Sequence, residues 1–474
     1  MQFEKITEES LATLDGFFKK QTTRMSVYTT AYQFMWKKDL FTPDYAIVGR
    51  CLVLKGSKRG KEYFFYPLSE NGDIAEEEKA IEKIEDYCRE RDLPLRYINV
   101  PEEKVGFLCS RYETGIHIEN VRAWQDYLYY AEDFRHFAGG KFAGQRNHVK
   151  KFYQRYPSAR FVPFQAGDEK KILDFLKEYE KTQFFKSDYY AKWELKMVKK
   201  LVPKMTELGI FGGYMQVDGK VVSFAAGERV KDMLVVGVEN ALRGYDGIYP
   251  ATAQAFVRAF ADDGVVYLNR EDDSGDLGLR KSKLQYRPCR MVKKFSLFVD
   301  KPLQKAERLP KIRTERLVLK RIPDSDGAAY ARLAGDVERN RFWGYDYRES
   351  LGRKTADEKF FLRLIRNDWR RRGEMSLGIY ESGRLIGEAV LHRFGYRGQA
   401  EVGVRLLPEY EGRGYAREAV RAATDYAFIA FGVERMEAKC YKENARSASM
   451  LEGAGMRRCG EDETYLYFYR TPAM

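Results

Sequence analysis

The sequence predicts an α/β protein with three similar units, each a mixed central sheet flanked by helices. Two kinds of observation support this fold class. A strand-like run, a Gly-rich turn and a helix-like run follow one another over 402–431, as in a strand–helix unit. Two hairpin-like segments, 211–226 and 377–389, each place Gly and Tyr before a short polar turn, followed by an apolar strand that ends in small residues. The similarity of these two segments suggests that the chain repeats one unit.

The first unit shows a comparable order of elements near the N-terminus. Two strand-like runs, 44–49 and 63–67, are expected to form a hairpin joined by the basic loop 55–61. A helix-like run over 74–91 and a strand over 94–100 follow.

Composition along the chain marks the boundaries between units. A polar, charged stretch bounded by prolines precedes residue 311, as is typical of linkers. From 311 onward the basic residues are about 25 Arg against about 6 Lys, whereas the earlier part is Lys-rich, which suggests fused modules. We expect a first unit over 1–164, a second over 165–300, a linker over 301–310 and a third unit over 311–474.

Overall composition excludes several classes of protein. With 474 residues, 44% hydrophobic and 14% aromatic residues, the chain can bury several cores and is not disordered. No apolar run reaches the roughly 20 residues of a membrane span, and the first residues lack a signal-peptide pattern. Six scattered cysteines and four histidines argue against a zinc site and a disulfide framework. We therefore expect a cytoplasmic protein without a metal or a membrane span.

The chain is basic, with a net charge of +13 and a pI near 9.1. Two interpretations stay open. The charge is either spread over a solvated surface, or it serves an anionic partner such as CoA, tRNA, the ribosome or a lipid headgroup. We do not expect DNA as a partner.

The Gly-rich turn over 408–419 is the most informative segment. It joins a strand to a helix, where backbone N–H groups at the helix N-terminus are unpaired and can bind a pyrophosphate. Gly412 and Gly414 let the backbone approach the phosphates without a Cβ in the way. A G-x-G triplet by itself would favour an ordinary strand–helix loop. A second segment, 444–456, favours the phosphate site.

Together, 408–419 and 444–456 resemble the acyl-CoA-binding turn and the N-x-x-S helix of GNAT N-acetyltransferases, especially the branch that acetylates ribosomal-protein N-termini. Residues 313–320 resemble the opening strand of that branch, so the likeness covers about 313–469. Glu411 departs from the usual Gln or Arg, and Met456 from the usual Phe. The resemblance implies acetyl-CoA as cofactor and an amine as substrate, either a small molecule or a protein N-terminus.

Acetyl transfer gives candidate roles to individual residues of the third unit, and the role of Ser447 is the one that the resemblance implies. Glu401 is the candidate base, Ser447 the residue that meets the leaving thiolate, and Tyr441 a further acid candidate. The alternatives are a surface glutamate, helix packing and a core aromatic. Asn444 either contacts the CoA arm or caps its helix, and backbone amides near Val404 and Arg405 would polarise the thioester carbonyl. The expected cofactor contacts are Val404, Arg405, Glu411, Gly412, Arg413, Gly414, Tyr415, Ala416 and Asn444.

The first 300 residues carry a different signature. Segments 127–129, 141–152 and 268–288 resemble the soluble catalytic module of phosphatidylglycerol lysyltransferases, which move an amino acid from aminoacyl-tRNA to a lipid. That module consists of two GNAT folds in tandem, so the resemblance implies three GNAT-like units in the chain. Those synthases also have a multi-span membrane half. Since this sequence shows no such half, we expect a soluble acceptor, with an anionic lipid headgroup as a peripheral alternative.

Acidic and basic residues of this module form a candidate substrate site. Carboxylates would bind the α-amino group and a side-chain amine of a lysyl or arginyl group, and cations a carbonyl or phosphate. The alternative is a structural ion-pair network, and the basic helix around Arg146 is either a solvated face or a contact for tRNA phosphates. The module is thus an aminoacyltransferase or a non-catalytic binding platform. The expected site residues are Asn269, Arg270, Glu271, Asp272, Asp273, Arg280, Lys283 and Arg146.

Overall fold

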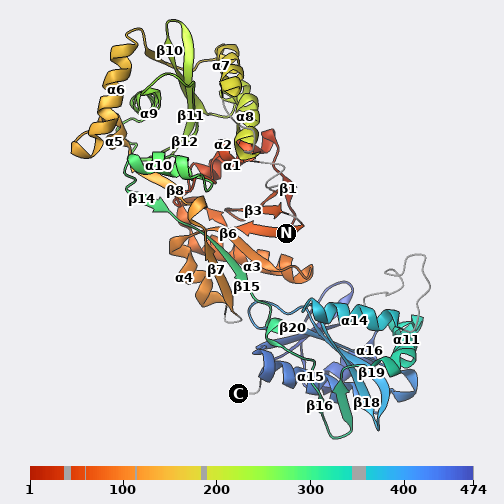
Figure 1. Ribbon diagram of the computed structural model, residues 1–474. Coiled ribbons are helices and arrows are strands. Elements are labelled where there is room, and N and C mark those ends of the chain that lie inside the picture. The colour runs from red at the N-terminus through yellow and green to blue at the C-terminus, as the bar shows by residue number, and fades with distance from the viewer. Residues whose placement is uncertain (37–43, 59, 113–114, 183–188, 344–358, 473–474) are drawn as a thin grey trace. The chain divides into compact units, whose positions relative to one another are not determined.

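The computed structural model describes the 474-residue chain except 37–43, 59, 113–114, 183–188, 344–358 and 473–474. Its described strands form three mixed sheets with helices on their faces, as the sequence predicts (Figure 1). Two compact units contain them. Unit 1 holds the second sheet and most of the first, and unit 2 holds the third. Unit 1 comprises 1–84, 96–107 and 118–297, and unit 2 comprises 85–95, 108–117 and 298–474.

The first sheet has the order β1-β2-β3-β4-β6-β15-β7, and β5 pairs with β3. Its strands are β1 (Glu4–Lys5), β2 (Asp44–Val48), β3 (Cys51–Lys58), β4 (Lys61–Phe65), β5 (Leu68–Ser69), β6 (Leu95–Pro101), β7 (Ile116–Asn120) and β15 (Lys294–Val299). The predicted strand at 94–100 is therefore present as β6, and the predicted helix at 74–91 as α3 (Ile74–Glu90). The expected two-stranded hairpin is wrong, because β3 lies between β2 and β4 and contains most of the predicted loop.

The second sheet has the order β14-β8-β13-β12-β11-β10-β9. Its strands are β8 (Asp126–Tyr130), β9 (Arg160–Pro163), β10 (Phe211–Val217), β11 (Lys220–Val230), β12 (Met233–Ala241), β13 (Tyr267–Asn269) and β14 (Arg290–Val292). The predicted hairpin is β10–β11, and its turn residues Asp218 and Gly219 both have positive φ, as a two-residue hairpin turn requires.

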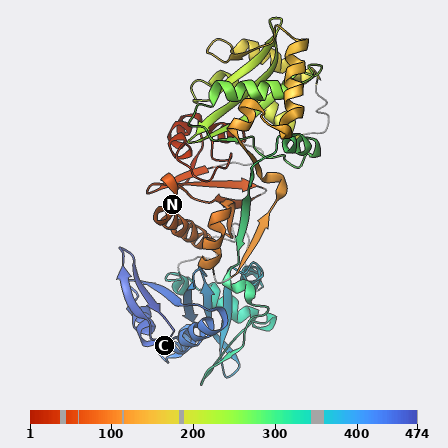
Figure 2. The same cartoon turned by 90° about the vertical axis from the view of Figure 1, so that its left-hand side faces the viewer.

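Helices cover both faces of the second sheet (Figures 1 and 2). Alternate residues of β11 point to opposite faces, and both sets are apolar. Phe224 packs with α7 and α8, whereas Ala225 packs with α5 and α9. A strand buried on both faces reads as a nearly continuous apolar run, and 221–226 is apolar except for Ser223. The helices are α5 (Ala131–His136), α6 (Ala143–Arg155), α7 (Glu169–Thr182), α8 (Tyr189–Leu201) and α9 (Ile248–Phe260).

The sheets divide the N-terminal part differently from the expected boundary at 164/165. Strands β8 and β9 precede that boundary but belong to the second sheet, and β15 follows the second sheet but returns to the first. The two predicted units are therefore interleaved along the chain.

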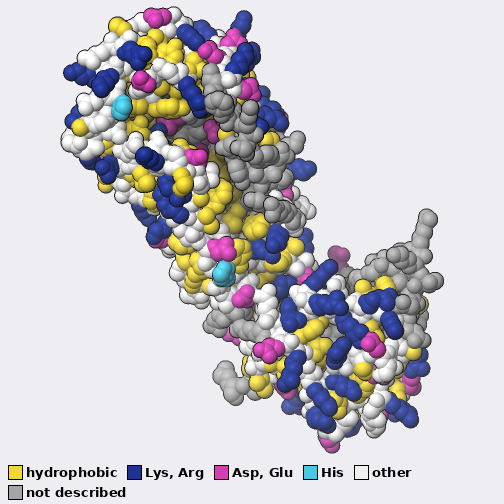
Figure 3. Space-filling model, in the orientation of Figure 1, with side chains coloured by type: hydrophobic (Ala, Val, Ile, Leu, Met, Phe, Trp, Pro, Cys, Tyr) yellow, Lys and Arg dark blue, Asp and Glu magenta, His cyan; other side chains and the backbone are white. Residues whose placement is uncertain are grey.

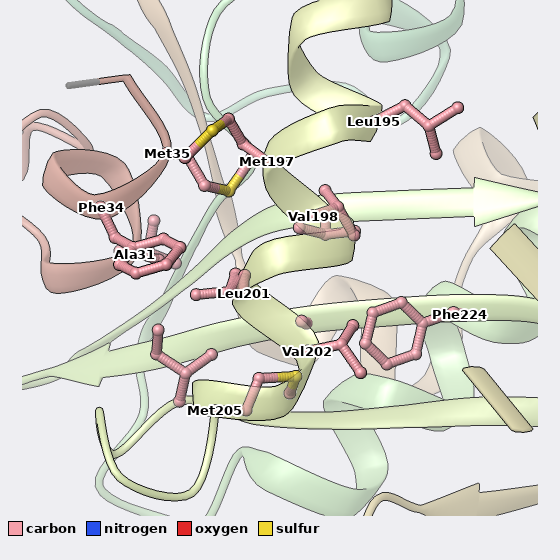
Figure 4. Close-up of a cluster of buried hydrophobic side chains, with 14 of the residues drawn as sticks. Ala31, Phe34, Met35, Leu195, Met197, Val198, Leu201, Val202, Met205 and Phe224 are labelled. Carbon is pink, nitrogen blue, oxygen red and sulfur yellow. The ribbon is translucent and has the colours of Figure 1, made fainter. Parts of the chain in front are cut away.

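A short helix, α2 (Thr30–Trp36), packs against α8. Phe34 and Met35 of α2 lie beside Met197 and Leu201 of α8 in the core of unit 1 (Figure 4). Glu228 of β11 accepts hydrogen bonds from the N–H groups of Thr30 and Ala31, 3.1 and 2.8 Å, at the start of α2. These contacts fix α2, whose other side chains take part in the site described below. The preceding helix is α1 (Glu8–Phe18).

The third sheet has the order β16-β17-β18-β19-β20-β21-β23-β22. Helix α15 (Tyr415–Phe431) packs on one face, and α11 (Gly327–Ala334) and α14 (Phe360–Arg370) pack on the other. The predicted hairpin is β18–β19, turning at Ser382 and Gly383 with positive φ. The strands are β16 (Ile312–Arg313), β17 (Leu317–Lys320), β18 (Met375–Glu381), β19 (Arg384–His392), β20 (Gln399–Leu406), β21 (Arg435–Tyr441), β22 (Arg457–Glu461) and β23 (Tyr465–Arg470).

Each sheet contains a parallel strand pair that meets over only a few residues. These pairs are β4–β6, β12–β13 and β20–β21. In the third sheet, β20 and β21 pair from Gln399 to Glu401 and then separate, although both strands continue. The separation opens the sheet edge over 402–406. Both candidate sites lie at such openings.

The segment expected to be a linker contributes to a core. Leu303, in the turn Pro302–Lys305, is fully buried among the apolar side chains of unit 2. Because truncating a buried leucine costs about 2–5 kcal/mol, Leu303→Ala should lower the free energy of unfolding by about that amount in urea titrations. Leu277→Ala is the control, since Leu277 is 74% exposed and its truncation should cost little. Equal stabilities of the two variants would show that the segment is a linker only.

The surface of each unit has its own character. On the visible face of unit 1, hydrophobic side chains gather with acidic side chains among them, whereas Lys and Arg cover much of the visible face of unit 2 (Figure 3). None of the helices among the described residues is long and apolar enough to cross a lipid bilayer.

Candidate functional site

Unit 1 contains a cavity of about 640 Å³ where its two sheets open. One wall comes from β4, β6 and β15 of the first sheet. The other comes from β12, the loop after β13, and helices α7, α8 and α9. Helix α2 contributes Tyr32, Gln33 and Trp36. The remaining polar and charged lining residues include Asn99, Tyr179, Glu194, Glu239, Asn240, Tyr249, Arg270, Glu271, Asp272, Asp273, Asp276, Lys283, Lys294 and Ser296.

The loop after β13 is held in an unusual backbone conformation. Glu271 has φ 53°, a left-handed value that is uncommon for a residue with a Cβ. Its N–H donates to Asn269 Oδ1 at 2.7 Å, and its carbonyl accepts from the Tyr127 N–H at 3.0 Å. Lys283 Nζ donates to the carbonyls on either side, those of Arg270 (2.6 Å) and Asp272. These bonds compensate the backbone strain and fix where the Glu271 side chain begins.

Gly237 of β12 makes room for the Glu271 carboxylate. A Cβ on Gly237 would lie 2.9 Å from Glu271 Oε1, and the φ of Gly237 is not in the left-handed range, so space rather than conformation calls for glycine here. Burial raises the pKa of Glu271 well above its ordinary value, and the nearby charge of Asp272 raises it further. A carboxyl group with a raised pKa in a cavity can accept a proton near neutral pH.

Asp272 and Lys294 belong to a second buried network. Lys294 Nζ lies 2.5 Å from Asp126 Oδ1 and 3.8 Å from Asp272 Oδ2. Burial opposes the charge of Lys294, but the two carboxylates raise its pKa above the ordinary value. Asp126 also accepts from the Ser26 N–H and from Asn269 Nδ2, at 2.8 and 3.2 Å. Lys294 is thus committed to protein carboxylates.

The expected pairing of Asp273 with a substrate cation needs correction. Both oxygens of Asp273 accept from Arg280 at 2.9 Å, and the Tyr127 hydroxyl donates to Oδ2 at 2.6 Å. Burial alone would raise its pKa, but these hydrogen bonds lower the pKa of Asp273 to about 2. Asp273 and Arg280 therefore tie the loop to helix α10 (Leu277–Gln285), and neither is free to bind a ligand.

Sequence reasoning missed two carboxylates of the cavity wall. Glu239 of β12 accepts from Arg270 Nε at 2.9 Å and Nη2 at 2.5 Å, and Glu194 of α8 lines the same cavity. The Arg270 guanidinium lies 4.7 Å from the Tyr286 ring centre and is mostly enclosed, so it orients Glu239 rather than binding a phosphate. Asn240 Oδ1 and Arg270 Nη1 are buried and have no hydrogen-bond partner among the described residues, and both residues line the cavity. In the sequence, Glu239 directly follows the apolar run 233–238. This change from apolar to charged residues was the signal that could have identified it.

Arg146 lies outside the cavity. It is exposed on α6 and donates to the carbonyls of Phe137 and of Gly139, the latter at 2.5 Å. Helix α6 also carries Lys150, Lys151 and Arg155. The hydrogen bonds of Arg146 fix the loop before α6. The structure therefore does not place Arg146 at the cavity, where the substrate contact was expected.

A second candidate site lies at the Gly-rich turn of unit 2. Gly412 and Gly414 have φ values of 72° and 81°, and Gly414 is the N-cap of α15. This conformation favours glycine and directs the first N–H groups of a 17-residue helix toward the turn. The N-terminal end of the helix dipole adds positive potential there. The geometry is that of an anion site.

Arg316 and Glu418 hold this turn in place. Arg316 Nη1 donates to the Arg413 carbonyl at 2.9 Å, and its Nε donates to Glu418 Oε2 at 2.7 Å. Thr314 Oγ1 donates to the other Glu418 oxygen at 2.6 Å. Glu411, the unusual residue of the turn, lies 3.7 Å from Arg446 Nη1, which offsets its charge.

The opened edge of β20 adjoins this turn. The Arg405 side chain points away from it into a buried cluster, with Glu388 at 2.6 and 2.9 Å and Asn340 at 2.9 Å. The Arg405 side chain is therefore part of this buried cluster, and a ligand contact by the backbone of Val404 and Arg405 stays a prediction.

The expected catalytic residues lie on β20, β21 and α16 (Ala445–Gly453). Glu401 lies 3.2 Å from Arg393 Nη1 and 3.8 Å from His392 Nε2. The Tyr441 ring packs at 4.6 Å from that of Tyr465. Asn444 Oδ1 accepts from the Ser447 N–H at 3.1 Å, so Asn444 caps α16.

Comparison with known proteins identifies both parts of the chain. Residues 19–298, more than half of the chain, match the family described as phosphatidylglycerol lysyltransferase, C-terminal. The chain belongs to this family. Residues 316–457 match the acetyltransferase (GNAT) domain. The protein is thus an acyltransferase by class, with a lysyltransferase-type module joined to a GNAT domain.

Individual relatives agree with this division. The chain is 27% identical over 165 residues to the uncharacterized N-acetyltransferase YoaA of Bacillus subtilis, covering 34% of this chain and 92% of that protein. It is 26% identical over 151 residues to the uncharacterized N-acetyltransferase p20 of Bacillus licheniformis, covering 31% and 82%. A conserved protein of unknown function from Bacteroides thetaiotaomicron, 24% identical with a TM-score of 0.59, matches 63% of this chain and 100% of its own and shares the fold.

Proposed function

We propose that the GNAT domain transfers an acetyl group from acetyl-CoA to an amine. The observation that carries this proposal is the glycine turn at the start of α15, beside the opened edge of β20. The pyrophosphate binds the N–H groups of Gly412 to Ala416. The thioester carbonyl lies along the backbone of Val404 and Arg405, whose amides stabilise the developing oxyanion.

The amine must lose a proton before it can attack the thioester. Glu401 accepts this proton, directly or through a water molecule. Arg393 Nη1 lies 3.2 Å from the Glu401 carboxylate, and this ion pair fixes the position of the carboxylate. Ser447 and Tyr441 are the groups that meet or protonate the leaving thiolate.

Ser447 offers a test of this assignment. Ser447→Ala should lower kcat about 10-fold or more and change acetyl-CoA affinity little, because the hydroxyl meets charge that exists mainly in the transition state. Steady-state kinetics with acetyl-CoA and a set of primary amines measures both quantities. Ser449→Ala is the control, since Ser449 is exposed on the same helix. An unchanged kcat in Ser447→Ala would show that Ser447 only packs its helix and takes no part in catalysis.

We propose that the N-terminal module transfers a cationic aminoacyl group, lysyl or arginyl, from aminoacyl-tRNA. The supporting observation is the enclosed cavity in which carboxylates surround the fixed loop after β13. Glu194 and Glu239 bind the cationic side chain of the amino acid, and Asn240 Oδ1 accepts from its ammonium group. Glu271 accepts the proton of the acceptor when the aminoacyl ester is attacked. The ester is already activated, so positioning and proton transfer suffice.

The tRNA requires a basic surface outside the cavity. The exposed cations of α6, including Lys150 and Lys151, supply one for its phosphates. Filter binding of lysyl-tRNA and uncharged tRNA over a salt series tests this proposal. Affinity should fall steeply with salt as counterions are released, and lysyl-tRNA should bind more tightly. Absent or salt-independent binding of both would contradict the tRNA donor.

A second candidate function is a binding platform without turnover. The ion pairs Asp273–Arg280 and Lys294–Asp126 favour it, because they stabilise structure and take no part in chemistry. On this account lysine or an aminoacyl analogue binds the cavity, but lysyl-tRNA is never consumed.

A further inference from the structure

Helix α10 lies on the surface of unit 1 (Figure 1), and its side chains reverse the usual arrangement of a surface helix. Its charged residues Arg280 and Lys283 point inward. Arg280 binds Asp273, and the buried Lys283 donates to two backbone carbonyls of the loop after β13. Its leucines point outward, since Leu277 is 74% exposed and Leu284 44%. A surface helix normally packs its apolar stripe against the core, so the outward leucines indicate a contact outside unit 1.

The outward face of α10 combines leucine with lysine. Residues 277, 281 and 284 have the spacing i, i+4 and i+7, which places Leu277, Lys281 and Leu284 on one face of the helix. Lysine is depleted in protein–protein interfaces. At a bilayer surface, by contrast, its ammonium group reaches the headgroups while neighbouring apolar side chains enter the lipid. This face therefore suits a lipid surface better than a protein partner.

A tryptophan continues this apolar face to the cavity. The turn Arg122–Trp124 lies beside the loop before α10, because a Cβ on Gly275 would lie 3.8 Å from the Ala123 Cβ. Trp124 is 42% exposed and lines the cavity, as does Leu279 of α10. Tryptophan is enriched at the interface between lipid and water, because its ring is apolar and its N–H is polar. The cavity wall and the leucine face are thus parts of one surface.

The sequence around this surface is strongly basic. Residues 274–293 contain six Lys and Arg residues and a single acidic residue. Lys281, Arg287 and Arg290 are exposed, and Glu102, 3.8 Å from Arg290, offsets only part of this charge. Cations close to a bilayer are attracted by anionic headgroups. Charge complementarity therefore favours an anionic bilayer over a neutral one.

We propose that α10 and Trp124 form a docking surface for an anionic lipid bilayer. Leu277, Leu284 and Trp124 enter the headgroup region, and Lys281 contacts lipid phosphates. Because Trp124 and Leu279 also line the cavity, docking brings the cavity to the membrane surface. Docking requires no turnover, so it can be measured whether or not the proposed aminoacyl transfer occurs.

Vesicle flotation with the intact protein tests this surface. Vesicles of phosphatidylcholine and phosphatidylglycerol in equal parts should bind the protein at least 10-fold more tightly than vesicles of phosphatidylcholine alone. The double variant Leu277→Gln, Leu284→Gln should bind the anionic vesicles at least 10-fold more weakly, because it keeps the charges and loses the apolar side chains. Ile429→Gln is the control and should bind as the wild type does, since Ile429 is 88% exposed on α15 of unit 2.

Several outcomes would overturn the proposal. Equal binding by the wild type and the double variant would place the contact elsewhere, as on the Arg-rich surface of unit 2. An equal loss in Ile429→Gln would show a general effect of exposed apolar side chains. Equal binding to both kinds of vesicle would contradict the role of charge. If the wild-type protein binds neither kind, the leucine face serves a protein partner.

Tryptophan fluorescence tests the position of the contact. Vesicles with brominated acyl chains quench a tryptophan that enters the lipid, so the quenching should fall by more than half in Trp124→Phe. It should persist in Trp193→Phe, since Trp193 is buried. Lys281→Glu should weaken binding to anionic vesicles several-fold, whereas Lys170→Glu, at an exposed lysine of α7, should not. Undiminished quenching in Trp124→Phe, or equal effects of the two lysine variants, would overturn the placement of the surface.

Discussion

Replacing Gly414 by Asp should abolish acetyl-CoA binding, with a loss of at least about 100-fold, or about 3 kcal/mol. Three effects add. The position has φ 81°, which costs a residue with a Cβ about 1–2 kcal/mol. The new Cβ would lie 3.3 Å from Arg316 Nη2, inside the contacts that hold the turn. The carboxylate would also face the pyrophosphate. Isothermal titration of the intact protein measures the loss.

The matched control lies at the other end of the same helix. Gly432 also has a left-handed φ, 63°, and a Cβ there meets no atom of the described residues within 4 Å. Gly432→Asp therefore carries the same charge and a similar backbone cost, but it should leave acetyl-CoA affinity within about twofold. Similar losses in both variants would mean that stability, and not the turn, explains the effect.

Replacing Glu271 by Gln should lower aminoacyl transfer by about 10²–10⁴-fold, the usual contribution of a general base. The amide keeps the size of the side chain but cannot accept the proton. Because burial and Asp272 raise the pKa of Glu271, the wild-type rate should rise with pH as this carboxyl group ionises. The variant should lose that rise. Single-turnover release of lysine from lysyl-tRNA at several pH values checks both results.

Two further variants separate position from general damage. Gly237→Ala moves the Glu271 carboxylate without changing any charge and should slow transfer at least several-fold. Gly144→Ala on α6 should be neutral, since a Cβ there meets nothing within 4 Å in the part of the chain that the structure describes. An unchanged pH profile in Glu271→Gln would assign the proton transfer to another group.

Local patterns made much of the fold predictable. The hairpins β10–β11 and β18–β19 have turn residues that tolerate positive φ, so their positions could be read directly. Strand β3 was missed because its polar end, 56–58, reads as a loop, and its pairing with β4 decides its structure. The interleaving of the first two sheets depends on β15, which pairs with strands nearly 200 residues earlier.

The candidate site was predictable only where its residues are close in sequence. Glu271 and Asp272 were found because they follow one another in a distinctive string. Glu194 and Glu239 come from α8 and β12, so only the fold brings them to the cavity. Asp273 was assigned to the substrate because the sequence does not show that Arg280 would bind both of its oxygens. At the glycine turn the sequence prediction was more complete, since strand, turn and helix are contiguous.

The central claim is that one chain carries two separate acyl-transfer sites. The most direct test incubates the intact protein with lysyl-tRNA labelled in lysine, a panel of neutral and anionic alcohol acceptors, acetyl-CoA labelled in acetyl and a panel of primary amines, and follows both labels. Glu271→Gln should lose lysyl transfer and keep acetyl transfer, and Gly414→Asp should do the reverse. Loss of both activities in either variant, or no transfer of one label by the wild-type protein, would contradict the claim.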